Sequence, residues 1–342
     1  MKAHRIEVFW VILLPLSFLW ALATFLRRKI FDSKLAYTSP LTIICVGNIH
    51  SGGSGKTPLV RLLAEKLKTF SPVILSRGYR GKLSAVGTQV DLKSQHGASL
   101  YGDEPWMLAQ QTGKPVFVGK NRLLLIKEIE RLIPNGLVLM DDGFQRLSVK
   151  KTLSLICINS DKSPDDNFCL PFGELREPLS AIAKSDGVVL TPGTKTEGVS
   201  LWKQILSHQF PQTPFFEAQL DLEGFYQGGQ SITLSHSEKI ASFCGIAAPG
   251  RFVDLLKSNF PLSNHLKSFP DHYNYRAQDV EWILSQGQKQ KAKTFVTTDK
   301  DWFKVAPLFK ETNVALVSLR YGYVMPDLFW KFLFDKLGGL VK

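Results

Sequence analysis

The hydrophobic pattern of the chain begins with one long apolar run. Residues 8–26 read VFWVILLPLSFLWALATFL and contain no charged residue. An α-helix rises about 1.5 Å per residue, so about 20 apolar residues are enough to cross the core of a bilayer. The basic residues 27–29 follow the run, whereas only Lys2 and Arg5 precede it. The pattern predicts a membrane-anchoring helix over residues 1–30, with the remainder of the chain on the cytoplasmic face.

Two other interpretations of this run agree less well with its residues. A cleaved signal peptide ends in small residues, but this run ends in Phe25 and Leu26, followed by two arginines. A buried soluble helix is the second alternative, although the run places aromatic residues on several faces of the helix. The pattern leaves open whether the helix spans the bilayer or, because of Pro15, lies in one leaflet.

After this run, short apolar segments alternate with segments of helical spacing. LTIICV at residues 41–46 is short, apolar and β-branched, as a buried parallel strand is, and residues 56–70 carry leucines at helical spacing. Further strand-like runs are PVILSRGY (72–79), GLVLMDDGFQ (136–145), LSLICIN (153–159) and GVVLTPG (187–193). Strands that alternate with helices predict a parallel sheet covered by helices on both faces.

The alternation lapses once and then resumes. Residues 219–232 read QLDLEGFYQGGQSI, so we expect a linker or a small hairpin near residues 215–232. Strand-turn-helix patterns then return in KIASFCGIAAPGRFVDLL and KTFVTTDKDWFKV, followed by the strand-like VALVSLRYG. The sequence therefore predicts an α/β protein with two Rossmann-like or P-loop domains, residues 31–214 and 215–342, after the N-terminal membrane helix.

Composition narrows the class of protein further. The 342 residues are enough for two domains, and 44% hydrophobic with 21% charged residues is typical of a globular chain. The net charge of +12 favours anionic partners such as phosphates or acidic lipid head groups. No RNA- or zinc-binding signature is present, so we expect no nucleic-acid partner. The four cysteines form no C-x-x-C pair and are predicted to be buried, reduced thiols.

The segment VGNIHSGGSGKTPLV at residues 46–60 is a candidate phosphate-binding loop. The P-loop pattern requires Gly, four free positions and then Gly-Lys-Ser/Thr, but His50 stands at the first glycine position. Lys56 would hold the β- and γ-phosphates of ATP, and the Thr57 hydroxyl would bind Mg²⁺. A flexible Gly/Ser loop before an ordinary helix is the alternative, which the strand-loop-helix context disfavours. The nucleotide-binding candidates are His50, Ser51, Gly52, Gly53, Ser54, Gly55, Lys56 and Thr57.

A pair of aspartates, Asp141 and Asp142, ends the run GLVLMDD. An apolar strand that ends in Asp is the Walker-B arrangement, in which a carboxylate meets the nucleotide's metal ion. Adjacent side chains point to opposite sides of an extended chain, so we expect one carboxylate to face Mg²⁺ and the other to contact a neighbouring group. Asp-Asp-Gly is also good turn chemistry, and a structural turn is the alternative.

Three further polar segments have both a structural and a functional interpretation. The acidic residues 103–104 in YGDEPWML suit a helix start. The Arg-Glu pair at residues 176–177 lies in a Gly/Pro-rich loop, where the arginine could clamp a phosphate. The Asp-His pair at residues 271–272 lies in another loop, and a lone histidine is more often structural.

Eight of these segments together resemble one family. VGN…GGSGKTP, SRGY, GDEP, DDGFQ, LREP, GIAAPGRF, PDHY and TTDKD occur in the order seen in tetraacyldisaccharide 4′-kinases, which are the lipid A 4′-kinases. The resemblance covers nearly the whole chain, including the N-terminal hydrophobic run and the irregular entry of the P-loop. A Gly-Lys-Thr alone is unspecific, whereas eight ordered motifs are highly specific.

The resemblance implies transfer of the ATP γ-phosphate to the 4′-hydroxyl of a tetraacylated glucosamine disaccharide 1-phosphate at the inner membrane. It implies that Asp103 is the catalytic base and that His272, from the second domain, is its partner, acting with Lys56. The Mg²⁺ set would be Thr57, Asp141, Asp142 and Glu104. Weaker candidates for contacts with the lipid acceptor are Tyr79, Arg122, Arg176 and Glu177. A carboxylate within hydrogen-bond reach can take the proton of a sugar hydroxyl during the transfer.

Two other classes of function agree less well with these residues than a kinase does. A membrane-bound P-loop switch or partitioning ATPase would hydrolyse nucleotide and would need no lipid acceptor, and therefore no Asp103–His272 pair. A non-catalytic lipid- or phosphate-binding scaffold would need no Mg²⁺ set, so Lys56, Thr57 and the paired aspartates disfavour it. Domain closure that brings His272 toward Asp103 is a further expectation of the kinase reading.

Overall fold

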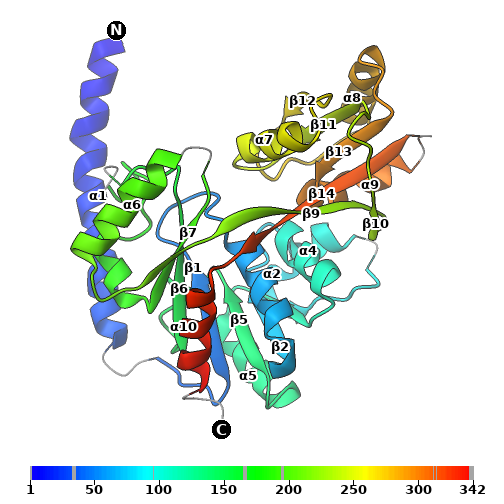
Figure 1. Cartoon of the computed structure of the whole chain (residues 1–342). Helices are drawn as coiled ribbons and strands as arrows, with labels where there is room; N and C mark the ends of the chain where they lie inside the picture. Colours follow the sequence, from blue (N-terminus) through cyan, green and yellow to red (C-terminus); the bar gives the residue numbers. More distant parts are fainter. Residues whose placement is uncertain are drawn as a thin grey trace.

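The computed structural model describes residues 2–32, 36–94, 96–164, 168–193, 196–310, 312 and 314–338. Its first element is a long helix, α1 (Lys2–Asp32), which lies beside the remainder of the molecule (Figure 1). Residue 1 and residues 339–342, which belong to the first and last predicted segments, lie outside the described residues.

The first body is built on an eight-stranded sheet. Its strand order is β3-β4-β2-β5-β1-β6-β7-β8, and all neighbours pair in parallel except β3 with β4. The strands are β1 (Thr42–Gly47), β2 (Pro72–Ser76), β3 (Thr88–Gln89), β4 (Val116–Val118), β5 (Leu137–Asp141), β6 (Leu153–Asn159), β7 (Gly187–Thr191) and β8 (Phe215–Glu217). The helices are α2 (Lys56–Lys66), α3 (Gly97–Tyr101), α4 (Asp103–Thr112), α5 (Arg122–Leu132) and α6 (Thr196–Gln209). The sheet is therefore mixed only at its edge.

Helices cover both faces of this sheet, as the apolar strand runs predict. Alternate residues of β1 face opposite ways, with Ile44 in one buried cluster and Ile43 in the other. Leucines of α2 and α4 pack in the first cluster, whereas α5 and α6 contribute Ile126 and Trp202 to the second. The P-loop thus lies at the carboxyl edge of a sheet that is fixed on both faces.

The second body is a smaller, six-stranded sheet with the order β10-β9-β14-β13-β11-β12. Its strands are β9 (Gln219–Gln227), β10 (Gln230–Ile232), β11 (Ile240–Cys244), β12 (Asn264–Ser268), β13 (Thr294–Thr298) and β14 (Ala315–Val324). Its helices are α7 (Pro249–Asn259), α8 (Ala277–Lys289) and α9 (Asp299–Phe309). Strand β9 runs antiparallel to both β10 and β14, and the other pairs are parallel. Residues 215–232 therefore contain a hairpin, formed by β9 and β10.

The long pair β9 and β14 links the two bodies (Figure 1). After β14 the chain returns to the first sheet, where α10 (Asp327–Gly338) buries Phe329, Leu333 and Leu337 in the first cluster, with the Phe329 ring against Phe216 of β8. Strand β8 also belongs to the first sheet. The boundary between residues 214 and 215 stays a prediction. In the structure the chain passes from the first sheet to the second between β8 and β9, and α10 packs on the first body.

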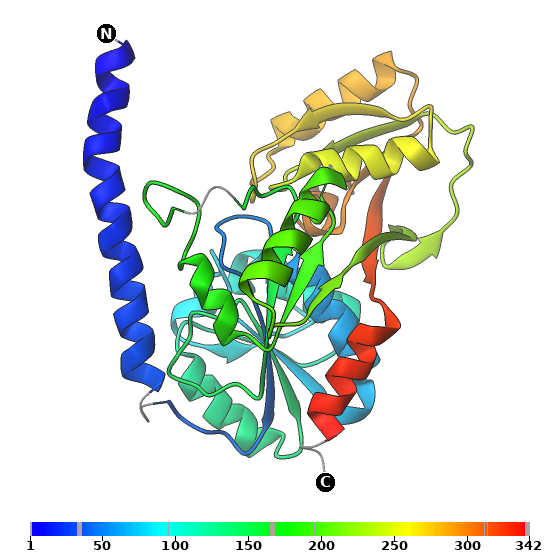
Figure 2. The ribbon, with the colours of Figure 1, turned by 60° about the vertical axis from the view of Figure 1, so that its left-hand side comes forward.

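Helix α1 stands apart from both sheets over much of its length (Figure 2). Its helical conformation confirms the helical part of the prediction for residues 8–26. Within the described residues, no helix is both long enough and apolar enough for a membrane crossing. From Ser17 onward, α1 contacts the first body. Ser17 Oγ donates to the carbonyl of Cys169 at 2.6 Å. The four cysteines are buried and free, as predicted.

Candidate active site

A cleft of about 600 Å³ lies between the two bodies, at the carboxyl ends of the parallel strands. Open α/β sheets bind ligands at this edge. The first body contributes the P-loop, the start of α4 and the end of β5, and the second contributes the loops before α7 and α8 and the start of α9. Its charged lining residues are Lys56, Arg61, Arg77, Arg80, Glu104, Asp141, Asp142, Arg176, Arg251, Asp271, His272, Asp299 and Lys300.

The P-loop enters the cleft as the strand-loop-helix pattern predicts. Helix α2 begins at Lys56, and its N-cap, Gly55, adopts a left-handed conformation with φ of 74°. The first backbone N–H groups of a helix and its dipole favour a bound anion. Lys56 Nζ lies 3.2 Å from Ser54 Oγ and 3.3 Å from Asp142 Oδ1. The loop therefore presents a cation and free backbone donors to the cleft.

The paired aspartates differ in environment. Asp141, the last residue of β5, is 2% exposed and accepts a hydrogen bond from Ser76 Oγ at 3.1 Å. Burial and the nearby Glu104 raise the pKa of Asp141 to about 7. Burial alone would raise the pKa of Asp142 too, but Lys56 and Arg176 hold it at about 2. Asp142 is therefore ionised at neutral pH, whereas the carboxyl group of Asp141 would lose its proton when a cation binds beside it.

The expectation that both aspartates belong to one extended segment was wrong in detail. Asp142 has φ of 52°, because the strand ends at Asp141 and the chain turns. This turn directs the Asp142 carboxylate to Arg176, whose Nη1 lies 2.9 Å from Oδ1 and 3.1 Å from Oδ2. Asp141 and Asp142 have different partners here, and the prediction that one of them faces Mg²⁺ stays a prediction.

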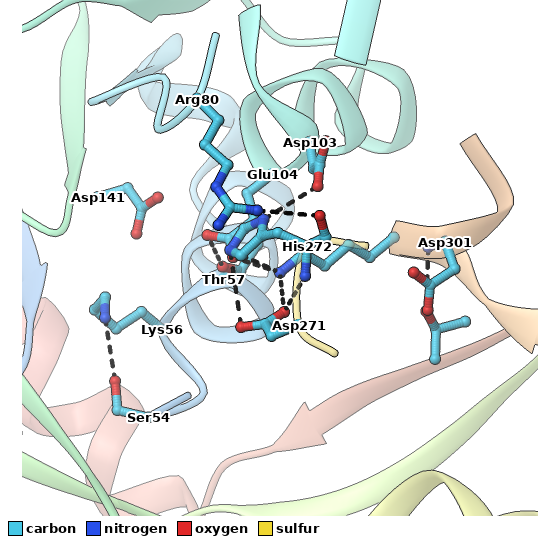
Figure 3. Close-up of polar contacts among 12 residues, drawn as sticks. Ser54, Lys56, Thr57, Arg80, Asp103, Glu104, Asp141, Asp271, His272 and Asp301 are labelled. Atoms are coloured by element: carbon cyan, nitrogen blue, oxygen red, sulfur yellow. Dashed lines mark hydrogen bonds and ion pairs between the residues drawn. The ribbon is translucent and has the colours of Figure 1, made fainter. Parts of the chain in front are cut away.

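Asp103 and His272 meet across the cleft (Figure 3). Asp103 is the first residue of α4, as its helix-start pattern suggests, and its Oδ2 lies 3.1 Å from His272 Nδ1. Burial alone would raise the pKa of Asp103, but the hydrogen bond with His272 and the charges of Lys304 and Lys300 lower it. The loop holds His272 with φ of 58°, and Arg80 donates to its carbonyl at 3.1 Å. Asp103 is thus an ionised carboxylate beside the cleft, in contact with the lining residue His272.

Glu104 connects this pair to the P-loop. Its Oε2 accepts a hydrogen bond from Thr57 Oγ1 at 3.2 Å, and its Oε1 lies 3.1 Å from Lys300 Nζ. Burial alone would raise the pKa of Glu104, but Lys300 and Lys56 lower it. Conversely, burial would lower the pKa of Lys300, which Glu104 and Asp271 raise above its ordinary value. Among the described residues, no group of three or more His, Cys, Asp or Glu side chains is arranged to hold a metal ion by itself.

Most of the predicted site residues line this cleft, and five do not. Asp103 is one of the five, and it contacts the lining residue His272. Tyr79 lines it, with its ring 5.4 Å from the His272 ring, and Arg176 lines it as well. His50 and Ser51 are absent from its lining, and the buried ring of His50 packs perpendicular to Trp202.

The other two candidates outside the lining are Arg122 and Glu177. Arg122 is 2% exposed and donates to the carbonyl of Gly119, so it is buried at the start of α5. Glu177 is also buried, and it pairs with Arg28 of α1. Their predicted contacts with the acceptor stay predictions.

Sequence reasoning missed three basic residues around the cleft. Lys300 and Lys304 lie one turn apart on α9, and Lys304 Nζ is 3.6 Å from Asp103 Oδ2. Arg251 of α7 reaches the first body and donates to Asn159 Oδ1. For Arg251 and Lys300 the available signal was their position just after strand-like runs, in GIAAPGRF and TTDKD, where a parallel sheet gathers its functional side chains.

Comparison with known proteins matches this architecture along most of its length. The family model described as tetraacyldisaccharide-1-P 4′-kinase matches residues 9–338. The tetraacyldisaccharide 4′-kinase of Desulfotalea psychrophila is 35% identical over 321 residues, which are 90% of this chain and 90% of that protein. The enzyme of the same name from Syntrophus aciditrophicus is 33% identical over 330 residues, with 88% of this chain and 86% of that protein covered.

A solved structure also resembles the chain. The crystal structure of LpxK from Aquifex aeolicus in complex with ATP superposes with a TM-score of 0.75 at 25% sequence identity. The match covers 94% of this chain and 98% of that one, so it includes both sheets. From the family match and these relatives, the chain belongs to the tetraacyldisaccharide 4′-kinase family.

Proposed function

We propose that this protein is a kinase that transfers the γ-phosphoryl group of ATP to the 4′-hydroxyl of a tetraacylated glucosamine disaccharide 1-phosphate. The product would be the 1,4′-bisphosphorylated precursor in lipid A biosynthesis. The carrying observation is that His272, which is paired with Asp103, shares one cleft with Lys56 and Thr57 of the P-loop. Family membership supports the same reaction.

The chemistry assigned to the cleft residues follows from their positions. The N-terminus of α2 and Lys56 would bind the β- and γ-phosphates of ATP. Asp103 would take the proton from the 4′-hydroxyl as its oxygen forms a bond to the γ-phosphorus. The bond between that phosphorus and the bridging oxygen breaks, and ADP leaves with the electron pair. Arg176 is placed to stabilise charge on the transferred group.

The residues present fit a magnesium ion. Mg²⁺ sites in kinases use one or two carboxylates, together with phosphate oxygens and water. Asp141 Oδ1 is buried without a hydrogen-bond partner among the described residues, as expected for an oxygen that coordinates a cation when one is bound. Thr57, Asp142 and Glu104 are the other residues that would hold the ion or its water ligands. When bound, the ion neutralises charge that develops on the phosphoryl group.

A switch ATPase would leave several of these features without a role. Such a protein positions one water molecule and needs no base paired with a histidine from a second body. Here Asp103 is held by His272, a cleft residue from the loop before α8, and the cleft is lined by basic residues of both bodies. Transfer to a sugar hydroxyl requires a positioned base, and binding of a large anionic acceptor is favoured by a cleft lined with basic residues.

A transfer assay tests the proposal. Radiolabelled ATP is incubated with detergent-solubilised tetraacyl disaccharide 1-phosphate and with wild type, Asp103→Ala, Lys56→Ala or Asp335→Ala as an exposed control. We expect label on the lipid 4′ position with wild type and control, and losses of about 10²- to 10⁴-fold in the Asp103 variant, the range of a positioned base. Label released only as inorganic phosphate would reject the kinase and favour the ATPase.

We also propose that α1 attaches the protein to the inner membrane, with both bodies on the cytoplasmic face. The support is a set of apolar side chains on α1 that are between 44% and 62% exposed. They are Leu16, Phe18, Leu19, Trp20, Leu22, Phe25, Leu26 and Ile30. An exposed apolar helix face beside basic residues favours a lipid surface, and the proposed acceptor is itself a lipid.

Vesicle flotation tests this attachment. The full chain is mixed with vesicles that contain anionic lipid, and the fraction that floats is measured for wild type, Phe18→Asp with Leu22→Asp, and Leu328→Asp. Leu328, on α10, is 66% exposed and serves as the matched control. We expect wild type and control to float and the double variant to stay with the soluble fraction. Equal flotation of all three would reject α1 as the attachment element.

A further inference from the structure

The second residue of α9, Lys300, touches the side of His272 that faces away from Asp103. Lys300 Nζ lies 3.3 Å from His272 Nε2, 3.1 Å from Asp271 Oδ1 and 3.1 Å from Glu104 Oε1. Its side chain is 13% exposed. Figure 3 shows His272 among Asp103, Glu104 and Asp271. The two nitrogens of the imidazole ring therefore face different charged partners from different elements.

The hydrogen-bonding capacity of these partners decides which nitrogen carries the proton. A lysine beside two carboxylates is an ammonium group at neutral pH, with three donors and no acceptor. Asp271 Oδ2 also faces Nε2, but at 3.8 Å it is beyond hydrogen-bond distance, so Nε2 accepts from Lys300 at 3.3 Å. A neutral imidazole with an accepting Nε2 has its proton on Nδ1, which lies 3.1 Å from Asp103 Oδ2 and donates to it.

We infer that Lys300 is a positioning residue that fixes His272 as the neutral Nδ1–H tautomer. Its consequence for catalysis rests on the proposed kinase function. In this tautomer His272 donates to Oδ2 of Asp103 and orients the carboxylate. No described residue hydrogen-bonds Oδ1 of Asp103, so this oxygen is left to take the proton of the acceptor hydroxyl.

The same arrangement keeps the proton on the base. Because Lys300 occupies Nε2 and Nδ1 already carries a proton, His272 has no site for the proton that Asp103 receives. Lys304, 3.6 Å from Asp103 Oδ2, adds a second positive charge near the carboxylate. Arg80 holds the loop through the carbonyl of His272 and does not touch the ring nitrogens. Lys300 is thus the group that selects the tautomer.

A purely structural role for Lys300 makes a different prediction. Lys300 also joins Glu104 of the first body to Asp271 of the second, so its loss could loosen the cleft without any effect on the tautomer. Such loosening would raise KM for both substrates and would leave the protonation pattern of His272 unchanged. The two roles are therefore separable by a readout on the ring itself.

Nitrogen NMR on the full chain with ¹⁵N-labelled histidine provides that readout. The chain has seven histidines, and His272→Gln identifies the signals of His272 by their loss. Spectra at neutral pH and steady-state kinetics are recorded for wild type, Lys300→Met, Lys300→Arg and Lys289→Met. Lys289 is an exposed lysine at the end of α8 and is the matched control.

We expect a pyrrole-type Nδ1 and a pyridine-type Nε2 in wild type, the Arg variant and the control. Lys300→Met should show averaged tautomer shifts, and its kcat should fall by about 10²-fold, the lower end of what a positioned acid–base group supplies. KM for ATP should change little, and Lys300→Arg should recover much of kcat.

A wild-type spectrum with a protonated Nε2 would overturn the inference, as would an unchanged His272 tautomer in Lys300→Met. Because the spectrum needs no substrate, it separates this inference from the kinase proposal. Wild type with the expected tautomer but without transfer to the lipid would reject the kinase function alone.

Discussion

His50 occupies the position where a P-loop pattern has its first glycine, and its side chain is buried beneath the loop. The ring lies 5.7 Å from that of Trp202 at 90°, and neither ring nitrogen has a hydrogen-bond partner among the described residues. Backbone pairing anchors the segment, because Ser51 N donates to the carbonyl of Glu174 at 2.7 Å. The His50 side chain therefore packs in the interior against Trp202. Residues 52–57 of the loop line the cleft.

Burial of this histidine predicts a specific loss of stability in acid. Burial and, to a smaller extent, Lys162 lower the pKa of His50 to about 4, from 6.5. The unfolded chain binds a proton between these values and the folded chain does not, so stability is present above pH 6.5 and is lost as the pH falls toward 4. This lowering of the His50 pKa corresponds to at most about 3 kcal/mol of stability.

Urea denaturation of wild type and His50→Phe at several pH values measures this effect. The stability difference between the two proteins should move by up to about 3 kcal/mol in favour of the variant as the pH is lowered. His96→Phe, at an exposed histidine, is the control and should show no such trend. Parallel pH curves for wild type and His50→Phe would show that His50 is not kept neutral by the fold.

At the scale of elements, the P-loop is shaped by a strand from the second sheet. Gly55 has φ of 74°, and a Cβ at this position would overlap the hydroxyl group of Tyr323 on β14. By contrast, Gly52 has φ of 90° and nothing within 4 Å of a Cβ. Gly55 is thus required for both backbone conformation and close approach, whereas Gly52 is required for conformation only. The phosphate-binding loop and the linking strand β14 are packed as one unit.

The sequence predicts those parts of the site that neighbouring residues determine. Strand, glycine loop and helix are adjacent in the chain, and Asp141 ends a strand, β5, that pairs directly with β1. By contrast, Asp103 and His272 are 169 positions apart, and only family resemblance joined them. Their contact depends on how two sheets pack, which local periodicity does not encode. The same reason explains why Lys300 was missed and why α10 could not be placed on the first sheet.

At the scale of the whole molecule, one buried arginine joins the P-loop helix, α2, to the strand pair β9–β14. This pair, which we call the ribbon, links the two bodies. Arg61 lies on α2, is 5% exposed, and donates from Nη1 to Glu223 Oε2 at 2.7 Å. Its Nη2 donates to the carbonyl of Tyr321 at 3.0 Å. Glu223 is on β9 and Tyr321 on β14, so a single guanidinium holds both strands of the ribbon against the helix that follows the P-loop.

This geometry predicts that the two carboxylates around Arg61 are unequal. Glu65 lies one turn along α2, 3.4 Å from Nη1, and its side chain is 48% exposed. Such an i,i+4 pair contributes about 0.2–0.5 kcal/mol, so Glu65→Ala should change the free energy of unfolding by no more than that. Glu223→Ala leaves a buried guanidinium without its main partner and should cost about 3 kcal/mol, the lower end for breaking a buried pair, because Glu223 is partly exposed. Urea denaturation of both variants measures the difference. Equal losses would mean that Arg61 stabilises its own helix and does not hold the ribbon, and the link between the P-loop helix and the second sheet would have to lie in the Tyr323 contact alone.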